Sequence, residues 1–184
     1  MKRIIIAGGP CTGKTTLINA LKEKFPDAYY APEAAESVIA RELDRAKADE
    51  NYTPIVPWTE YEKFVPLVID ESLVIESAIP DDVEIAFLDR SLIDNFAYFE
   101  INNYHDYHDL VQEKVADAKY DMALICEPVG IHETTEIRRE DAEQAAKVHG
   151  IIKDVYKKSG IKIVEIPFVT VPERVDIVSD VLQY

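Results

Sequence analysis

The amino-acid sequence predicts an α/β fold, a three-layer sandwich in which a five-stranded parallel sheet lies between helices. Three observations lead to this prediction. Short apolar runs alternate with longer stretches of helical periodicity along the chain. The runs are continuously apolar, as expected of strands that are buried on both faces. The first run ends at a glycine-rich phosphate-binding pattern that opens a helix.

Five apolar runs are the predicted strands. The first is closed by Gly8 and Gly9, and the last is closed by Pro167, which are residue types that interrupt strands. Right-handed crossovers between parallel strands bring their carboxyl ends to one edge of the sheet, where ligands bind in such folds. The predicted strands are Ile4–Ala7, Ala28–Ala31, Ile85–Leu88, Met122–Cys126 and Ile161–Ile166.

Helical periodicity fills the stretches between these strands. Thr59 and Glu62 have the spacing of a capping box at the start of a long amphipathic helix. Thr170 and Glu173 have the same spacing before the last helix. The predicted helices contain residues 17–25, 34–48, 61–72, 140–158 and 171–182.

Length and composition indicate one globular domain over residues 1–184. Of the 184 residues, 47% are apolar and 30% are charged, so the chain can bury a core of its own. With 20 Lys and Arg against 35 Asp and Glu, the formal net charge is −15. Such a surface repels phosphate backbones and anionic lipid, so we expect no nucleic-acid partner and no membrane insertion.

The cysteines and the first residues of the chain indicate a cytoplasmic protein. Cys11 and Cys126 have no partner at a metal-binding spacing, which fits a reducing compartment. The first apolar run stops at Gly8 and is too short for a signal peptide or a spanning helix. The sequence does not predict the oligomeric state.

Residues 8–15 carry the most specific pattern of the chain, because they match G-x-x-x-x-G-K-[ST]. The glycines let backbone N–H groups turn toward phosphate oxygens, and the next helix presents its positive end to the same anion. Lys14 would reach the β- and γ-phosphates, and the Thr15 hydroxyl would ligate Mg²⁺. The predicted site for ATP or GTP consists of Gly8, Gly9, Pro10, Cys11, Thr12, Gly13, Lys14, Thr15 and Thr16.

A second acidic group for the magnesium shell follows the third predicted strand. Asp89 ends the apolar run Ile85–Leu88, and Arg90 and Ser91 come next. Because P-loop sites use an acid at the end of a neighbouring strand, we expect Asp89 to hold Mg²⁺ together with Thr15. Arg90 would bind a phosphate or hydroxyl region of a substrate beside the γ-phosphate.

Two residues are candidates for the acceptor side of the site. Glu33 follows the second strand and would accept a proton from an acceptor hydroxyl, or would serve only as a first-turn acid of the next helix. Trp58 follows Pro57 and would line an acceptor pocket, or would pack against the start of the long helix.

A lid-like segment is predicted at about residues 128–140, between the fourth strand and the next helix. It carries Arg138 and Arg139, one of which would stabilise charge on the transferring phosphoryl group. Arg174 follows the last strand, where a nucleobase would lie. Residues 104–109 combine His105, His108 and aspartates, but a solvated loop and helix start explains them better than a metal site.

The motifs together resemble a P-loop ATPase and kinase family that includes the ribosylnicotinamide kinase domain of NadR proteins and the Ttd14 protein. The resemblance spans almost the whole chain. It implies the fold of nucleoside and nucleotide kinases, with strand order 2-3-1-4-5. In related deoxynucleoside kinases an acid after strand two acts as base, and Glu33 matches it. The resemblance is carried by residues 8–16, Pro32-Glu33-Ala34-Ala35, Pro57-Trp58, Leu88-Asp89-Arg90-Ser91, Asp94, Ala97-Tyr98 and Arg139-Glu140.

Two functions from different classes follow from these motifs. The first is a small-molecule kinase that transfers the γ-phosphoryl group of ATP to a nucleoside-like acceptor, with Glu33 or Asp89 as the base. The second is a regulatory ATPase or GTPase module with slow hydrolysis and a protein or lipid partner. The chain contains no Asn-Lys-x-Asp motif for guanine, and Arg90 follows Asp89 where an ATPase would need a second acid. These features favour the kinase.

Overall fold

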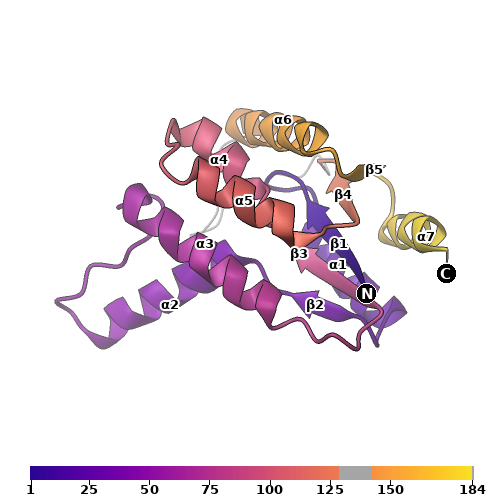
Figure 1. Cartoon of the computed structure of the whole chain (residues 1–184), viewed down its shortest axis with the longest axis horizontal. Coiled ribbons are helices and arrows are strands. Elements are labelled where there is room, and N and C mark those ends of the chain that lie inside the picture. Colours follow the sequence, from indigo (N-terminus) through magenta and orange to yellow (C-terminus); the bar gives the residue numbers. More distant parts are fainter. Residues whose placement is uncertain (129–141, 184) are drawn as a thin grey trace.

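A computed structural model of the protein describes residues 1–128 and 142–183 (Figure 1). The chain forms one five-stranded parallel sheet in the order β2-β3-β1-β4-β5, which confirms the predicted fold class and strand order. Each predicted strand is present, with its ends within three residues of the expected position. The strands are β1 (Lys2–Ala7), β2 (Tyr29–Ala31), β3 (Ile85–Asp89), β4 (Met122–Cys126) and β5 (Lys162–Ile166).

The register of the central strand fixes the geometry of the site. Ile6 of β1 lies opposite Asp89 of β3 on one side and opposite Leu124 of β4 on the other. Because the phosphate-binding pattern begins two residues after Ile6, this register brings it beside Asp89 at the carboxyl edge of the sheet.

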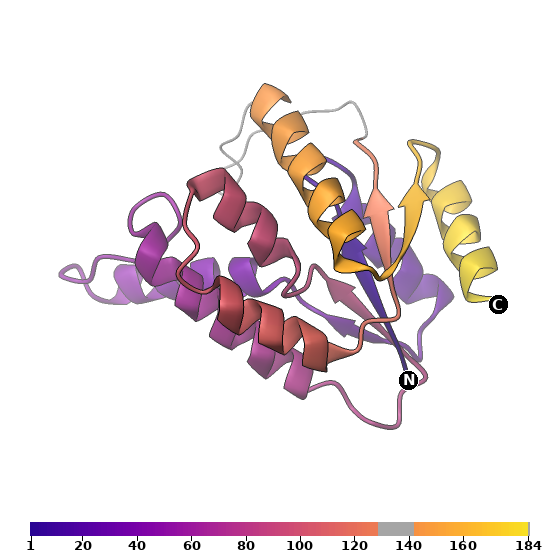
Figure 2. The ribbon, with the colours of Figure 1, turned by 45° about the horizontal axis from the view of Figure 1, so that its top comes forward.

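Helices cover both faces of the sheet. One face packs against α1 and α7 through a core that includes Leu17, Leu21 and Val178. The opposite face packs against α3, α4, α5 and α6, with Ile152 and Tyr156 of α6 fully buried. Figure 2 shows α6 in front of the sheet and α7 beyond β5. The helices are α1 (Lys14–Lys24), α2 (Ala34–Ala48), α3 (Tyr61–Ser77), α4 (Asp94–Asn102), α5 (His108–Ala118), α6 (Ala142–Ser159) and α7 (Val171–Leu182).

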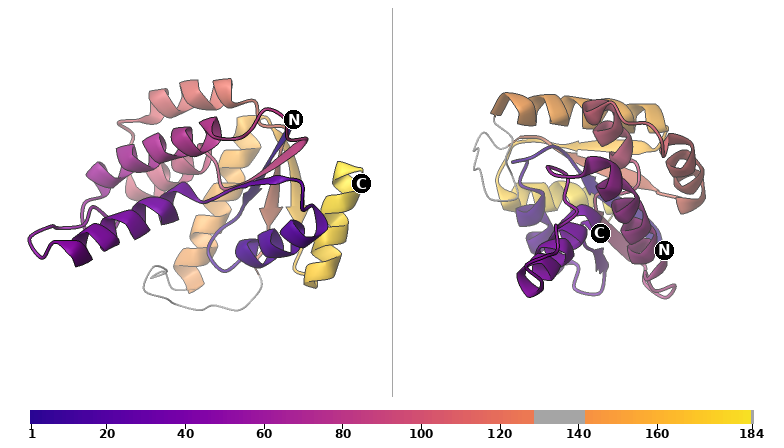
Figure 3. Two further views of the ribbon diagram at one scale, coloured as in Figure 1. Left: turned by 90° about the horizontal axis from the view of Figure 1, so that it is seen from below. Right: turned by 90° about the vertical axis from the view of Figure 1, so that its left-hand side faces the viewer.

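Helices α2 and α3 form a hairpin that extends away from the sheet (Figures 1 and 3). A small apolar cluster of Val38, Ile39, Val56 and Phe64 holds the two helices together. Val56 belongs to the connection between them, so this connection is packed against the helices. The hairpin begins directly after the carboxyl end of β2 and therefore lies beside this edge of the sheet.

The structure corrects one of the two predicted capping boxes. Helix α3 begins at Tyr61 after Glu60, and the Thr59 hydroxyl instead donates to the carbonyl groups of Pro54 and Val56. Thr59 therefore stabilises the turn before α3. The other capping box is confirmed, because the Glu173 carboxylate accepts the backbone N–H of Thr170 at 2.9 Å at the start of α7.

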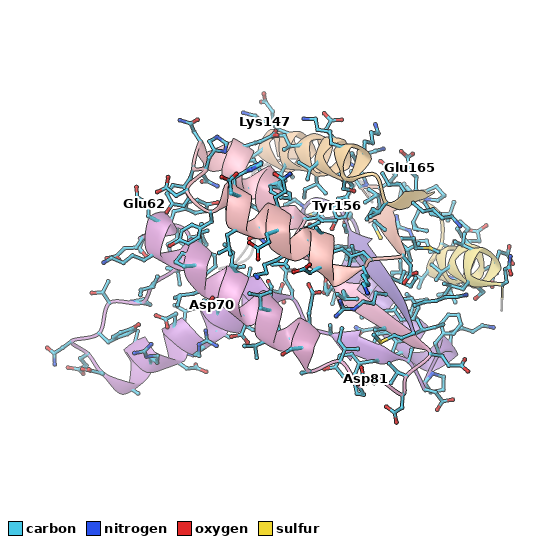
Figure 4. All side chains as sticks on the ribbon, in the orientation of Figure 1. Glu62, Asp70, Asp81, Lys147, Tyr156 and Glu165 are labelled. Carbon is cyan, nitrogen blue, oxygen red and sulfur yellow. The ribbon has the colours of Figure 1, made fainter. Side chains whose placement is uncertain are left out.

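The acidic composition is distributed over the outer surface. Among the labelled side chains of Figure 4, Glu62, Asp70, Asp81 and Glu165 are exposed and point outward from α3, the α3–β3 connection and β5. The phosphate-binding loop, by contrast, contains a buried lysine, Lys14. An anionic ligand would therefore meet positive charge at this loop.

Candidate active site

The loop between β1 and α1 has a backbone that only small residues permit at two positions. Gly8 adopts φ +138°, and a Cβ at this position would lie 2.7 Å from the carbonyl oxygen of Cys126. A Cβ at Gly9 would lie 2.7 Å from the Cβ of His149. Gly8 and Gly9 therefore let the loop pack tightly on β4 and α6, with α1 beginning at Lys14 as a phosphate site requires.

Lys14 is the first residue of α1, and its side chain is buried against the loop. Its Nζ donates to the carbonyl oxygens of Gly8 and Gly9, each at 3.2 Å. Burial, and next the positive charge of Arg90, lowers the pKa of Lys14 from 10.5 to about 8. Glu33 and Asp89 offset this shift only in part, and a triphosphate would add further negative charge beside Lys14.

Asp89 is the last residue of β3, and its charge interacts with that of Lys14. Burial, followed by the charge of Glu33, raises the pKa of Asp89 to about 6, while Lys14 and Arg90 act in the opposite direction. Its Oδ1 is buried and, among the described residues, has no hydrogen-bond partner. Thr15 is exposed and lines the same cavity as Lys14. The Asp89 carboxylate oxygen and the Thr15 hydroxyl are hard oxygen ligands of the kind that Mg²⁺ prefers.

Arg90 lies at the centre of an ionic network with two carboxylates. Its Nε is 3.0 Å from Glu33 Oε1, and its Nη1 is 3.1 Å from Asp94 Oδ1. Nη1 also donates to the carbonyl oxygen of Gly8 at 3.3 Å, and the guanidinium lies over the Tyr98 ring. Arg90 adopts φ +66°, which for a residue with a Cβ is tolerated where surrounding contacts hold it. The structure thus joins Glu33 and Arg90, two predicted acceptor-side residues, in one ion pair.

Tyr156 and Asp94 hold this network from behind, and sequence reasoning assigned neither of them to the site. The Tyr156 hydroxyl donates to Asp94 Oδ2, which also accepts the backbone N–H of Ser91 at 3.0 Å. Tyr156 is fully buried in α6. No sequence pattern indicated that a tyrosine on α6 would reach Asp94.

His149 is a third residue that the sequence did not reveal as part of the site. Its Nδ1 accepts the backbone N–H of Gly9 at 3.2 Å, and its Nε2 lies 3.3 Å from Glu127 Oε2. Burial lowers the pKa of His149 although Glu127 acts against this, so the ring is neutral at neutral pH. The neutral ring can accept from Gly9 and donate to Glu127, and it supports the loop from α6.

Arg174 has a different place from the one the sequence predicted. It is buried, and its guanidinium donates to the carbonyl oxygens of Thr12 at 2.7 Å, Pro167 at 3.0 Å and Glu127 at 3.1 Å. These contacts occupy the guanidinium with backbone oxygens, so a nucleobase contact is replaced by a bracing role. Arg174 ties the phosphate-binding loop to the ends of β4 and β5.

A cavity of about 520 Å³ opens directly from the phosphate-binding loop. It lies between the α2–α3 hairpin, α4 and the start of α6, and its volume is typical of sites for small ligands. Trp58 lines it, as one of the two predicted alternatives proposed. The lining combines loop residues (Pro10, Lys14 and Thr15), carboxylates (Glu33 and Glu36), the cation Arg90 and aromatic rings (Trp58, Tyr61, Phe64 and Tyr98).

Two segments that the sequence analysis singled out remain: the lid-like segment and residues 104–109. Arg138 and Arg139, with most of the lid-like segment 128–140, lie outside the described residues. Within residues 1–128 and 142–183, no group of three or more His, Cys, Asp or Glu side chains is arranged to hold a metal ion. In the segment 104–109, His108 begins α5 and its ring packs against Phe96.

Fold and loop together are those of a P-loop domain. Residues 3–174 match the family model described as AAA domain, and the chain belongs to this family. This confirms the resemblance that the sequence motifs predicted. None of the curated protein sequences compared with the chain matches it. In the described part of the chain, no helix has the length and apolarity needed to cross a membrane.

Solved structures of thymidylate kinases and of NadR protein share the fold. Thymidylate kinase from Candida albicans superposes with a TM-score of 0.69 at 16% identity, covering 99% of this chain and 91% of that one. Thymidylate kinase from Ehrlichia chaffeensis gives 0.66 at 18% identity, covering 100% and 98%. NadR protein in complex with NAD and AMP-PNP gives 0.70 at 20% identity, covering 100% of this chain and 50% of that one. The chain thus spans half the length of the NadR chain.

Proposed function

We propose that the protein is an ATP-dependent small-molecule kinase, which transfers the γ-phosphoryl group of ATP to a hydroxyl group of a nucleoside-like acceptor. The observation that carries the proposal is the cavity of about 520 Å³ that Lys14, Thr15 and four aromatic rings line together. A regulatory module needs a nucleotide site, but it does not need a cavity that extends from the phosphate-binding loop to an aromatic lining on the α2–α3 hairpin and α4. The thymidylate kinase and NadR structures that share this fold support a kinase.

The residues of the phosphate-binding loop would hold the triphosphate. Backbone N–H groups of residues 8–16 would surround its phosphates, and Lys14 would move its ammonium from the loop carbonyls to the β- and γ-phosphates. The NadR structure contains AMP-PNP, an analogue of ATP, which supports ATP as the donor here. GTP remains the alternative donor, because we find no described residue that selects the base.

Thr15 and Asp89 would hold Mg²⁺, and Asp89 brings an oxygen to which no residue of the described ranges donates. When bound, Mg²⁺ neutralises charge on the β- and γ-phosphates. With Asp89 assigned to the metal, Glu33 is the carboxylate that would accept the proton of the acceptor hydroxyl. Its partner Arg90 would then stay close to the transferring group, where it can balance negative charge.

The aromatic part of the cavity would bind the acceptor. Trp58, Tyr61, Phe64 and Tyr98 offer faces and edges against which a planar base or ring can stack. The lid-like segment 128–140 would close over the triphosphate with Arg138 or Arg139. We assign all of these steps to a single domain over residues 1–184.

The test is ATP consumption by the purified protein with Mg²⁺, alone and with each member of a nucleoside panel that includes ribosylnicotinamide. The kinase proposal expects that one acceptor raises ATP consumption at least tenfold and that mass spectrometry finds its phosphorylated product. Tight ATP binding without any acceptor-dependent turnover would contradict it and would favour the regulatory module. The Glu33→Gln variant should then lose acceptor-dependent turnover while it retains ATP binding.

A further inference from the structure

A buried carboxylate lies far along α2 from the phosphate-binding loop and takes no part in the steps above. Glu42 is 1% exposed. Its Oε2 accepts the Tyr52 hydroxyl and the backbone N–H of Ile55 at 3.1 Å, and its Oε1 accepts Arg45 Nη1 at 3.1 Å. The guanidinium of Arg45 also lies 4.4 Å from the centre of the Tyr52 ring. A single side chain of α2 therefore holds two points of the α2–α3 connection.

The connection that Glu42 holds leads directly into the cavity wall. Three residues after Ile55, the chain reaches Trp58, and both Pro57 and Trp58 line the cavity beside the phosphate-binding loop. Val56 is fully buried between α2 and α3. Because Ile55 and Val56 are fixed and Pro57 restricts the backbone, the position of Trp58 follows from the position of residues 52–56.

The three donors around Glu42 favour its ionised form. A buried carboxylate without donors would be costly, whereas Glu42 receives a phenol, a backbone amide and a guanidinium. Burial tends to raise the pKa of Glu42, but the donated hydrogen bonds and the charge of Arg45 outweigh it and hold the pKa below its ordinary value. Glu42 thus stays ionised and keeps its donors over the physiological pH range.

We propose that Glu42 is a positioning residue that sets the acceptor end of the cavity: through Tyr52 and Ile55 it holds the segment that presents Trp58. Glu42 does not line the cavity. The inference rests on the proposed function for its consequence in catalysis, but its structural part concerns Trp58 alone. Loss of these contacts of Glu42 should weaken acceptor binding and leave the triphosphate site intact.

The sequence provides a direct probe, because Trp58 is the only tryptophan of the chain. We would measure its emission, excited at 295 nm, and its quenching by acrylamide in wild type, Glu42→Gln and Tyr52→Phe. Both variants should shift the emission to longer wavelength and raise the quenching constant about twofold or more. Tyr52→Phe retains the charge of Glu42 and the ring over which Arg45 lies, so it stays informative if Glu42→Gln fails to fold. Glu50→Gln, an exposed residue of the same connection, is the matched control.

The kinetic arm uses the nucleoside that gives the highest turnover in the panel. We expect the KM for this acceptor to rise about tenfold in Tyr52→Phe and Glu42→Gln, while kcat and the KM for ATP stay within twofold of wild type. A general structural defect would instead change both KM values and kcat together. Unchanged Trp58 emission and quenching in the folded variants would overturn the proposal, as would an unchanged acceptor KM. If no nucleoside is turned over but the Trp58 signals change as expected, the proposed function fails while the assignment of Glu42 stands.

Discussion

At the scale of single residues, the site contains a lysine and an aspartate whose pKa values are shifted toward one another. Burial lowers the pKa of Lys14 to about 8 and raises the pKa of Asp89 to about 6. Both shifts disfavour the charged form in the free protein, and both would be relieved by a ligand that carries phosphates and Mg²⁺. In the free protein, the charged forms of Lys14 and Asp89 therefore lower the free energy of unfolding.

Replacing Asp89 should show this effect on the free energy of unfolding. The pKa of Asp89 is raised in the folded state to about 6 from an ordinary 3.8, so the folded protein holds the proton more tightly than the unfolded chain does. The ionised carboxylate consequently destabilises the fold above about pH 6, and this penalty vanishes below the ordinary pKa. We predict that Asp89→Asn raises the free energy of unfolding by about 1–3 kcal/mol at pH 8 and lowers phosphoryl transfer at least about 100-fold.

Denaturant unfolding at pH 8 and at pH 3.5 measures the first effect, and the gain should be confined to pH 8. A variant that is less stable than wild type at pH 8 would contradict this reading of Asp89.

The shifted lysine predicts a pH dependence of ATP binding. In the free protein Lys14 loses its proton as the pH rises through about 8, whereas a bound triphosphate favours the ammonium form. We expect the ATP affinity to fall above pH 8, by up to about tenfold per pH unit, with uptake of one proton on binding. Calorimetry in buffers of different ionisation enthalpy detects the proton. The matched variant Lys14→Ala should bind ATP at least about 100-fold more weakly and without this pH dependence. An affinity that is constant from pH 7 to 9.5 in wild type would contradict the role of Lys14.

At the scale of elements, the phosphate-binding loop depends on α6 as much as on its own glycines. Gly9 packs against the backbone and Cβ of His149, and its N–H is accepted by the His149 ring. The sequence identified the loop, because the loop is a local pattern. It could not identify His149 or Tyr156, because their partners lie more than 60 residues away and depend on how α6 docks on the sheet.

A pair of glycine variants tests this contact. Gly9→Ala should lower ATP affinity at least tenfold, because its Cβ would meet His149 Cβ at 2.7 Å and Cα at 3.0 Å, and the loop must shift. Gly150 follows His149 in α6, and in Gly150→Ala no atom would lie within 4 Å of the added Cβ. This variant should bind ATP as wild type does and raise stability by about 0.5–1 kcal/mol. Equal ATP affinities of the two variants would contradict the packing of the loop on α6.

The strands show what local sequence determines in this fold. Continuous apolar runs such as Met122–Cys126 were predicted with correct bounds, because a strand buried on both faces has few alternatives. The capping box at Thr59 was wrong because two prolines and Val56 form a turn there, in which the hydroxyl finds nearer acceptors. Helix α5 was predicted only at its start, since its charged sequence has a single fully buried residue, Val111.

At the scale of the whole molecule, Arg174 connects the last helix with the phosphate-binding loop. Its guanidinium bonds to three carbonyl groups, which belong to the loop, to the end of β4 and to the end of β5. The sequence placed Arg174 near the site correctly but assigned it to a nucleobase, because position along the chain does not reveal burial. The fold, strand order and family were predictable because they rest on motifs spread over almost the whole chain.

This connection predicts that a distant helix controls both stability and nucleotide binding. Arg174→Lys cannot reach all three carbonyl groups and should lower the free energy of unfolding by about 2–4 kcal/mol, with a parallel loss of ATP affinity. Arg41→Lys alters only an exposed ion pair with Glu71, whose charges it retains, and should change stability by less than about 0.5 kcal/mol. Urea unfolding with and without ATP compares the two. Wild-type stability in Arg174→Lys would show that the brace is unimportant.

The central claim is that the γ-phosphoryl group passes from ATP to a bound acceptor in the cavity beside Lys14. The most direct measurement follows γ-labelled ATP with the best acceptor of the nucleoside panel and determines which product carries the label. We predict that the label appears in the acceptor, bound to one of its hydroxyl oxygens, and that Lys14→Ala abolishes its transfer. Label found only in inorganic phosphate, at a rate that no acceptor changes, would contradict the claim.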